Sequence, residues 1–344
     1  MYKNITLAKF FFNIFEIMTK EIKRIGVLTS GGDAPGMNAC IRAVVRTAIY
    51  NDIEVFGIKY GYEGLIDNNM CRMESKSVAH IIQRGGTILK TARSEAFRTK
   101  EGREKAYENI KKNNIDALIV IGGDGTFTGA EIFSNEHNIP IVGAPGTIDN
   151  DLYGTDFTIG YDTAINTVIE AVDKIRDTAA SHSRLFFIEV MGRDAGFIAL
   201  RSGIAVGAEA ILIPETKTYI NELIEHLENG RRKNKTSGII IVAEGEEEGG
   251  AFEIAKKVKE RFNYYDTRVS ILGHLQRGGS PSCMDRVLAS TLGYESVNAL
   301  IAGKTKVMIG QVNKDITHTP FKKAIKHTVE IDIKMLEMSY ILSI

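Results

Sequence analysis

Short apolar runs alternate with longer amphipathic segments along most of the chain after Lys23. Apolar runs of about four to eight residues bounded by glycine or polar residues are typical of buried strands, and longer segments with apolar positions three or four apart are typical of helices. The pattern predicts strands at residues 25–28, 55–58, 117–121, 139–143, 185–190, 210–213, 238–243, 269–272 and 306–310. It predicts helices at 39–50, 101–113, 163–180, 220–229, 252–262 and 285–302.

Strands and helices that alternate in this way form a mostly parallel sheet with helices on both faces. We therefore predict an α/β fold of the doubly wound type. A chain of 344 residues is long enough for two domains. No repeat or Pro/Ser-rich linker marks a boundary between them.

Composition excludes several kinds of partner. Lys and Arg number 43, as do Asp and Glu, so the charge balance predicts neither a nucleic acid nor an anionic membrane as partner. The three cysteines, Cys40, Cys71 and Cys283, are scattered, which is typical of a reducing compartment and predicts no zinc site.

The amino terminus is unusual. The apolar segment at 9–18 is too short to span a bilayer, and no small-residue cleavage site follows it. Because Met18 directly precedes the first clear strand, we hypothesise that residues 1–17 are an upstream extension of a protein whose natural translation begins at Met18. Residues 1–22 are treated as an amino-terminal extension.

Two polar motifs follow predicted strands. GGDGT occupies residues 122–126, and PGTIDND occupies 145–151. Ligands collect at the carboxyl ends of parallel strands, where glycines let the backbone approach a phosphate and carboxylates hold Mg²⁺ or take a proton. Phosphoryl transfer needs this combination. The alternatives are an Asp-Gly turn for the first motif and an Asx-rich turn for the second.

The second motif carries two acids, Asp149 and Asp151, separated by one residue. An extended segment would point both to the same side, so that one accepts a substrate proton while the other serves a metal. The earlier glycines at 31 and 32 fit either a phosphate contact or a tight turn.

The chain resembles the ATP-dependent 6-phosphofructokinases of the bacterial type. The resemblance extends from about residue 23 to 310 through GVLTSGGDAPGMNA, GGDGT, PGTIDND, EVMGRDAG and LGHLQRGGSP, in that order. GGDGT also occurs in NAD kinases and diacylglycerol kinases, whereas PGTIDND and GHLQRGG distinguish the phosphofructokinases. The resemblance implies two α/β domains with crossed-over chain segments. It places residues 23–160 and 274–322 in an ATP-binding domain, and 161–273 and 323–344 in a fructose 6-phosphate-binding domain.

The resemblance also implies a reaction, in which the γ-phosphoryl group of MgATP moves to the 1-hydroxyl of fructose 6-phosphate. Asp149 matches the catalytic base, Thr147 the residue beside the transferred group, and Arg93 and Arg193 the groups that neutralise its charge. The implied ATP contacts, with Asp124 on Mg²⁺, are Gly32, Arg93, Ser94, Gly123, Asp124, Gly125 and Thr126. Gly32 is also implied in catalysis, and Asp151 is a further candidate ligand for the metal.

Several arginines and one histidine match contacts to the sugar phosphate, although such residues taken singly are more often solvated surface groups. The contacts implied within one subunit are Thr147, Ile148, Asp149, Met191, Gly192, Arg193, Glu244, His274, Leu275, Gln276 and Arg277. Arg184 and Arg268 match arginines that reach the 6-phosphate from a neighbouring subunit. The site would then be complete only in an oligomer.

An effector site for ADP or phosphoenolpyruvate at a subunit interface is implied as well. Arg42 and Arg46 lie four apart and hence on one helix face, which is also what a plain solvated face would show. The implied members are Arg42, Arg46, Arg176, Gly207, Glu209, Lys233 and Lys235. Relatives commonly carry a basic residue at the position of Ser75, and many carry glycine at the position of Lys90.

We therefore interpret the sequence as a cytoplasmic, glycolytic, ATP-dependent 6-phosphofructokinase that is homotetrameric and uses Mg²⁺. Pyrophosphate-dependent relatives typically carry Asp at the position of Gly125 and Lys at that of Gly146, so ATP is the expected donor. The alternatives are a pyrophosphate-dependent enzyme and a non-catalytic, phosphosugar-sensing regulatory subunit.

Overall fold

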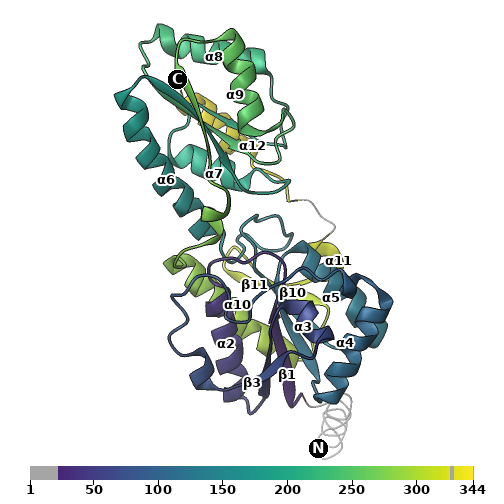
Figure 1. Ribbon diagram of the computed structural model, residues 1–344. Helices are drawn as coiled ribbons and strands as arrows, with labels where there is room; N and C mark the ends of the chain where they lie inside the picture. Colours follow the sequence, from purple (N-terminus) through teal and green to yellow (C-terminus); the bar gives the residue numbers. More distant parts are fainter. Residues whose placement is uncertain (1–21, 326–328, 344) are drawn as a thin grey trace, which may run out of the picture.

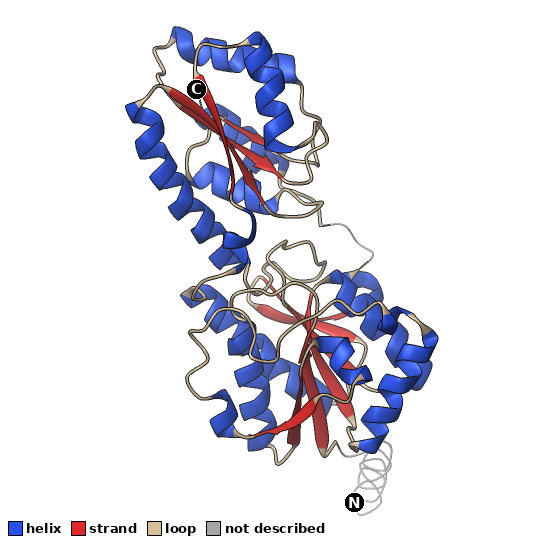
Figure 2. Cartoon of the chain, in the orientation of Figure 1, coloured by secondary structure: helices blue, strands red, loops and turns tan. Residues whose placement is uncertain are grey.

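Two sheets form the framework of the chain, one mostly parallel and one fully parallel (Figures 1 and 2). The structure is a computed structural model that describes residues 22–325 and 329–343. The hypothesised extension at 1–17 lies outside the described residues. The predicted α/β class is confirmed, and each predicted strand and helix has a counterpart.

The first sheet has the strand order β11-β10-β5-β4-β1-β2-β3. Its inner strands are parallel, whereas β3 and β11 pair antiparallel at the two edges and were not predicted. The bounds are β1 (Arg24–Thr29), β2 (Glu54–Ile58), β3 (Met70–Met73), β4 (Ala117–Gly122), β5 (Ile141–Pro145), β10 (Val307–Val312) and β11 (Asp315–Pro320).

The second sheet has the order β7-β8-β6-β9. All its neighbouring strands are parallel. The bounds are β6 (Arg184–Val190), β7 (Ala210–Leu212), β8 (Gly238–Ala243) and β9 (Asp266–Ile271).

Helices cover both faces of each sheet (Figure 2). They are α2 (Met37–Tyr50), α3 (Gly61–Ile66), α4 (Lys100–Lys112), α5 (Asp124–His137), α6 (Tyr161–Ser181), α7 (Phe197–Ala205), α8 (Ile220–Arg232), α9 (Gly250–Arg261), α10 (Cys283–Ile301), α11 (Phe321–Ala324) and α12 (Ile333–Leu342). Single turns of 3₁₀ helix occur at Ser75–Val78 and Ala96–Arg98, and a slightly longer one at Gly273–Arg277.

Alternation along the strands assigns side chains to the two faces. In β4, Leu118 and Val120 pack in the cluster under α4 and α5, while Ile119 and Ile121 pack in the cluster under α2 and α10. Figure 1 shows α2 and α10 on one side of this sheet and α4 and α5 on the other. Strands buried on both faces read as continuous apolar runs, which is why the sequence reveals them.

One hydrophobic cluster joins the two sheets. The cluster under α2 and α10 continues through α6 and reaches Ile188 and Ile241 of the second sheet. The chain passes to the second sheet through α6, returns through the 3₁₀ helix Gly273–Arg277 to α10, and then places α12 against α7 and β7 (Figure 1). The domain boundaries given above stay predictions.

Candidate active site

The carboxyl ends of three adjacent strands form one side of the candidate site. β5, β4 and β1 are neighbours in the first sheet and run parallel, so the segments that follow them meet at one edge. The segments after β6, β8 and β9 meet in the same way in the second sheet. Open parallel sheets bind ligands at such edges. The motifs after β1, β4 and β5 therefore lie together.

The glycine-rich segment after β4 forms the start of α5. Gly123 is the N-cap residue and Asp124 lies in the first turn, with no side chain capping the helix. The hydroxyl of Thr126 donates to the carbonyl of Ser30 at 3.0 Å, which ties this turn to the segment after β1. A Cβ on Gly122 would lie 2.5 Å from that same carbonyl, so the close approach requires glycine. An uncapped helix amino terminus at a strand end suits a phosphate group.

The two glycines that bear on the phosphoryl donor differ in their surroundings. Gly125 is exposed, and no atom lies within 4 Å of a Cβ built there. A Cβ on Gly146 would lie 3.0 Å from Ile121 and 3.1 Å from Met37. A side chain would therefore have room at Gly125, whereas at Gly146 it would meet neighbouring side chains.

The acidic motif does not form an extended segment. Residues 148 and 149 form a bend, and Asn150 has a left-handed backbone with φ of 55°. Asparagine tolerates this conformation better than most residues, and it turns the chain between the two acids. Asp149 is buried, and its Oδ1 atom has no hydrogen-bond partner within the described part of the chain. A buried acceptor without a partner is unusual, which makes this oxygen a candidate for contact with a ligand.

The acids influence one another electrostatically. Burial raises the pKa of Asp149, the guanidinium of Arg277 opposes this rise, and Glu244 adds to it. Burial also raises the pKa of Asp151 to about 6, and the neighbouring charges of Asp149 and Asp124 contribute. Asp124, Asp149 and Asp151 therefore belong to one site.

Arg277 connects this acidic group to the segment after β1. Its guanidinium lies against Gly32, because a Cβ built there would be 2.6 Å from Nη1, and it donates to the carbonyl of Asp33 at 3.3 Å. The structure thus brings Gly32, Arg277 and Asp149 together from three distant parts of the sequence. Among the residues matched to the sugar phosphate, Thr147 is buried beside Asp149, and Ile148 is fully buried in the core.

The second sheet contributes a hydrogen-bonded cluster. The Oε1 atom of Glu244 accepts from the backbone N–H groups of Gly192 and Arg193 at 3.3 and 2.7 Å. Gln276 is fully buried, accepts from the N–H of Met191 at 3.2 Å and donates to the Gly273 carbonyl at 3.1 Å. Arg193 has a left-handed backbone with φ of 56° and interacts electrostatically with both buried acids. His274 and Leu275 are exposed beside this cluster.

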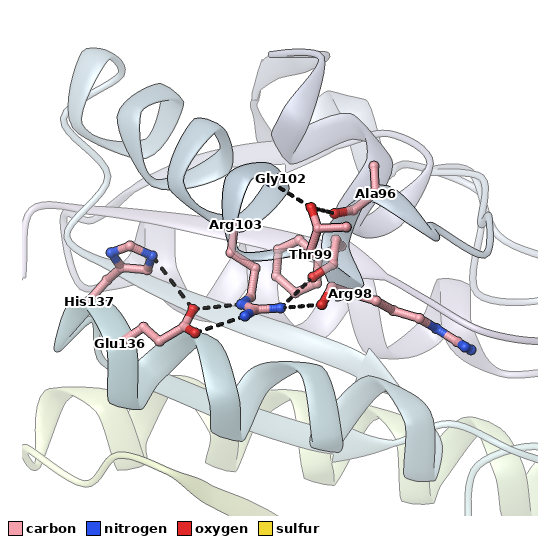
Figure 3. A network of polar contacts seen from close by, with 8 residues as sticks. Ala96, Arg98, Thr99, Gly102, Arg103, Glu136 and His137 are labelled. Carbon is pink, nitrogen blue, oxygen red and sulfur yellow. Dashed lines mark hydrogen bonds and ion pairs between the residues drawn. The ribbon is translucent and has the colours of Figure 1, made fainter.

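An ion pair between the buried Arg103 and the more exposed Glu136 fixes the segment that follows Arg93 and Ser94 (Figure 3). Arg103 in α4 donates to both carboxylate oxygens of Glu136 in α5, at 2.5 and 2.8 Å, and to the carbonyls of Phe97 and Arg98. The Ser94 hydroxyl accepts from the Phe97 N–H at 3.1 Å. Arg93 is exposed, and no interaction partner is seen for its side chain among the described residues.

Two predicted substrate residues lie away from the site in this chain. Arg184 begins β6 and Arg268 lies near the start of β9, and both bind the carboxylate of Asp266. The site is at the other end of β6, six residues along the strand, which is about 20 Å.

The predicted effector residues form two groups. In α2, burial and the neighbouring Arg46 lower the pKa of Arg42. In the second sheet's unit, Arg176 donates to the carbonyls of Val206 and Gly207, and Lys235 binds Glu209 at 2.7 Å. Lys233 is exposed at the end of α8. Figure 1 shows α2 and α8 at opposite parts of the molecule, so one chain does not unite the two groups.

Sequence comparison places these observations in a family. The model of the family described as Phosphofructokinase matches residues 24–300. The chain belongs to the phosphofructokinase family. It is 59% identical over 306 residues to ATP-dependent 6-phosphofructokinase 2 of Bacteroides thetaiotaomicron, covering 89% of this chain and 94% of the relative. It is 54% identical to ATP-dependent 6-phosphofructokinase 1 of Thermus thermophilus, covering 94% of this chain and all of the relative.

Solved phosphofructokinase structures have the same fold. The structure of phosphofructokinase from Saccharomyces cerevisiae superposes with a TM-score of 0.84 at 40% identity, covering 88% of this chain and 45% of the yeast chain. The chain thus spans less than half the length of that relative. A pyrophosphate-dependent phosphofructokinase from Marinobacter aquaeolei gives a TM-score of 0.81 at 22% identity, with 93% of this chain and 92% of the other covered. That likeness concerns the fold.

Two residues that support the phosphofructokinase site were not predicted from the sequence. Tyr62 donates to the carbonyl of Thr126 at 2.6 Å, and Arg103 fixes the segment after Ser94. Neither lies in a motif. Tyr62 binds backbone 64 positions away, whereas Arg103 binds backbone five and six positions away. Residue spacing carries no signal for such contacts.

Proposed function

We propose that the chain is an ATP-dependent 6-phosphofructokinase, a phosphotransferase of glycolysis that converts fructose 6-phosphate and ATP to fructose 1,6-bisphosphate and ADP. One observation carries the proposal. Asp149 presents a buried, unpartnered carboxylate oxygen between the open start of α5 and the charged groups Arg277 and Arg193. The curated relatives at 54–59% identity are named for this reaction.

The roles of the residues follow from this arrangement. Asp149 accepts the proton of the sugar 1-hydroxyl as the new phosphorus–oxygen bond forms, since a base with a pKa above the ordinary aspartate value is better suited to proton transfer. The start of α5 and the glycines at 123 and 125 hold the donor phosphates. Arg277, Arg193 and Arg93 neutralise charge on the transferred group.

Mg²⁺ fits the acidic group of this site. The ion is usually held by one or two carboxylates together with substrate phosphates, and it keeps octahedral geometry. Asp124 lies in the first turn of α5, and the pKa of Asp151 is raised partly by Asp124, so both carboxylates are near the expected phosphates. These two residues would hold the ion, which neutralises phosphate charge when bound. Within residues 22–325 and 329–343, no three His, Cys, Asp or Glu side chains are grouped to hold a metal by themselves.

The open space at Gly125 supports ATP as the donor. No atom lies within 4 Å of a Cβ built at Gly125, so the first turn of α5 has open space beside it that a nucleotide can fill. Pyrophosphate is the alternative donor, and a non-catalytic regulatory subunit is the alternative role. The second is disfavoured because Asp124 and Asp149 are both present.

Replacing Asp149 by Asn tests the assignment. Purified protein is given Mg²⁺ and fructose 6-phosphate with either ATP or pyrophosphate, and release of ADP or phosphate is followed. We expect turnover with ATP that exceeds turnover with pyrophosphate. Asp149→Asn should lower kcat by about 10²–10⁴-fold while ATP binding changes little, because a general base contributes that much.

Three results would contradict parts of this proposal. Equal turnover in the Asp149→Asn protein removes the residue from the role of base. Preference for pyrophosphate overturns the donor. Binding of fructose 6-phosphate without turnover from either donor supports the regulatory alternative.

We also propose a cytoplasmic homotetramer with effector control. The separation of Arg184 and Arg268 from the site, and of the two effector groups from each other, is what sites shared between subunits require. None of the described helices is both long enough and apolar enough to cross a membrane. Ser75 lies in the 3₁₀ helix Ser75–Val78, and a serine supplies no cationic group for an effector phosphate.

A further inference from the structure

The segment that follows the acidic motif folds back onto it. Asn150 and Thr158 are both buried, and they lie on either side of the loop formed by residues 151–157. A parallel bridge pairs Gly146 with Ile159, and the N–H of Ile159 donates to the carbonyl of Pro145 at 2.9 Å. The loop therefore begins and ends beside the motif.

Side-chain hydrogen bonds close this loop from both ends. The hydroxyl of Thr158 donates to the carbonyl of Thr147 at 2.7 Å. The Oδ1 atom of Asn150 accepts from the Thr158 N–H at 2.8 Å, and its Nδ2 donates to the carbonyl of Asp156 at 3.2 Å. We call Asn150, Thr158 and these three bonds the motif clamp.

The loop is also tied to the rest of the molecule just beyond the clamp. Asp285 of α10 accepts from the Gly160 N–H at 2.8 Å and from the Thr163 N–H at 2.8 Å. Asp285 is buried, so its carboxylate is a fixed acceptor rather than a mobile surface group. The clamp thus connects the bend at Asp149 to α10 and to the start of α6.

The carboxylate of Asp149 has one oxygen without a partner, while the Thr147 side chain and the charges of Arg277 and Arg193 act on the carboxylate as a whole. The unpartnered oxygen is Oδ1, and nothing in the described chain holds it directly. The N–H of Asp149 donates to the Thr147 hydroxyl at 3.2 Å, and the Thr147 carbonyl is the group that Thr158 binds. The backbone of 147–150 therefore sets where both Thr147 and Asp149 lie, and Thr158 binds that backbone.

We propose that Asn150 and Thr158 are positioning residues that hold Thr147 and Asp149 in the geometry needed for proton transfer. The proposal rests on the proposed function, because it assigns the clamp to that same reaction. In the described chain no hydrogen bond joins Asn150 or Thr158 to the start of α5 or to Gly32, although Thr147 lies against Gly123, where a Cβ would be 3.4 Å from the Thr147 Cβ. We therefore expect the larger effect of the clamp on turnover and a smaller one on nucleotide binding. Loss of positioning by about 1 Å can lower a rate by about 10²-fold.

A pair of substitutions at residue 158 isolates one hydroxyl. Thr158→Val keeps the shape but removes the hydroxyl that contacts the Thr147 carbonyl and the Asn150 Oδ1 atom. Thr158→Ser keeps that hydroxyl while removing a methyl group. We expect Thr158→Val to lower kcat about 10–100-fold with the KM for ATP changed less than about twofold. Thr158→Ser should restore kcat to within about threefold of the original chain, which a purely structural packing role would not do.

A second pair separates the side-chain bonds of Asn150 from its backbone conformation. Glycine adopts a left-handed backbone readily, so Asn150→Gly removes the bonds without strain. We expect Asn150→Gly to lower kcat about tenfold or more. The matched control is Asn138→Gly, because Asn138 is exposed at the end of α5, has φ of 51°, and makes no side-chain hydrogen bond in the described chain. That variant should keep full turnover.

Amide hydrogen exchange gives a readout that does not depend on activity. Peptides spanning 147–151 should exchange faster in Thr158→Val and Asn150→Gly than in Thr158→Ser and the original chain. Thermal unfolding midpoints show that each variant is folded.

The outcomes distinguish this proposal from the proposed function. If Thr158→Val keeps kcat, or if Thr158→Ser loses as much as Thr158→Val, the clamp does not position the base. An original chain that is inactive with both donors contradicts the proposed function, and the exchange pattern alone then supports or overturns the clamp.

Discussion

At the scale of single residues, the main feature of the candidate active site is that carboxylates lie partly or wholly out of contact with bulk water. Charged groups that leave water are destabilising unless partners compensate. Asp149 is buried, Asp151 is half-buried, and Asp151 interacts electrostatically with Asp149 and Asp124. The pKa values of Asp149 and Asp151 are raised because their neighbours do not fully compensate for the loss of water around the carboxylates. Carboxylates in such surroundings lower the stability of the folded chain. They are typical of sites where the negative charge takes part in a reaction or binds a cation.

Asp151 should therefore destabilise the ligand-free protein at neutral pH. Its pKa in the folded chain is about 6 against an ordinary 3.8, so the stability it contributes is greatest below about pH 4 and is lost as the pH rises through 6. We expect Asp151→Asn to raise the free energy of unfolding by about 2 kcal/mol at pH 7 and to have little effect at pH 4. Urea denaturation without Mg²⁺ or nucleotide measures this. Asp67→Asn, at an exposed position after α3, is the control.

At the scale of elements, the inner strands and the longer helices are predictable, and the edges are not. Strand β11 alternates weakly, and its hairpin turn is Asn313-Lys314, in which both residues have positive φ. Two-residue hairpin turns of this kind usually contain glycine, and this turn contains none. Helix α5 is the exception among the longer helices and was not predicted at all, because the glycines around Asp124 are poor helix formers whose helical state is set by the packing of Phe127 and Phe133.

In the candidate site, too, some features can be predicted from the sequence and others cannot. The motifs identify Asp149 and Asp124, since their residue types lie close together in the chain. They do not reveal that Arg277 lies against Gly32, because that contact joins residues more than 240 positions apart through two strand ends. They also favour an extended motif at 147–151, whereas the left-handed Asn150 bends it.

The ion pair between α4 and α5 should stabilise both helices and the segment after Ser94 (Figure 3). Arg103→Lys keeps the charge but cannot make the forked contact to Glu136 or both carbonyl contacts, so we expect a loss of about 2–3 kcal/mol in the free energy of unfolding. The KM for ATP should rise as the segment loosens. Arg98→Met is the control, because that exposed side chain extends away from the network and pairs only weakly, at 3.5 Å, with Glu95. Equal stability of the two variants would contradict the role given to Arg103.

At the scale of the whole molecule, a positively charged surface lies far from the candidate active site of its own chain. Arg184 and Arg268 share one carboxylate, Asp266, at the far end of the second sheet, and two arginines around a single acid leave excess positive charge. That surface suits an anionic group such as a sugar phosphate presented by a neighbouring chain. A symmetric pair of chains would then complete two sites reciprocally.

Mixing two inactive variants should therefore restore activity. Asp149→Asn lacks the base, and Arg184→Ala with Arg268→Ala lacks the arginines donated to the neighbour, so each homo-oligomer should turn over poorly. In a mixed pair of chains, one of the two sites has an intact Asp149 and receives intact arginines. Random reassembly from dissociated chains makes half the pairs mixed, which predicts about a quarter of the original activity. Unmixed samples carried through the same dissociation are the control. If the arginines served their own chain, every site in the mixture would remain defective, and the activity would equal the sum of the two parents.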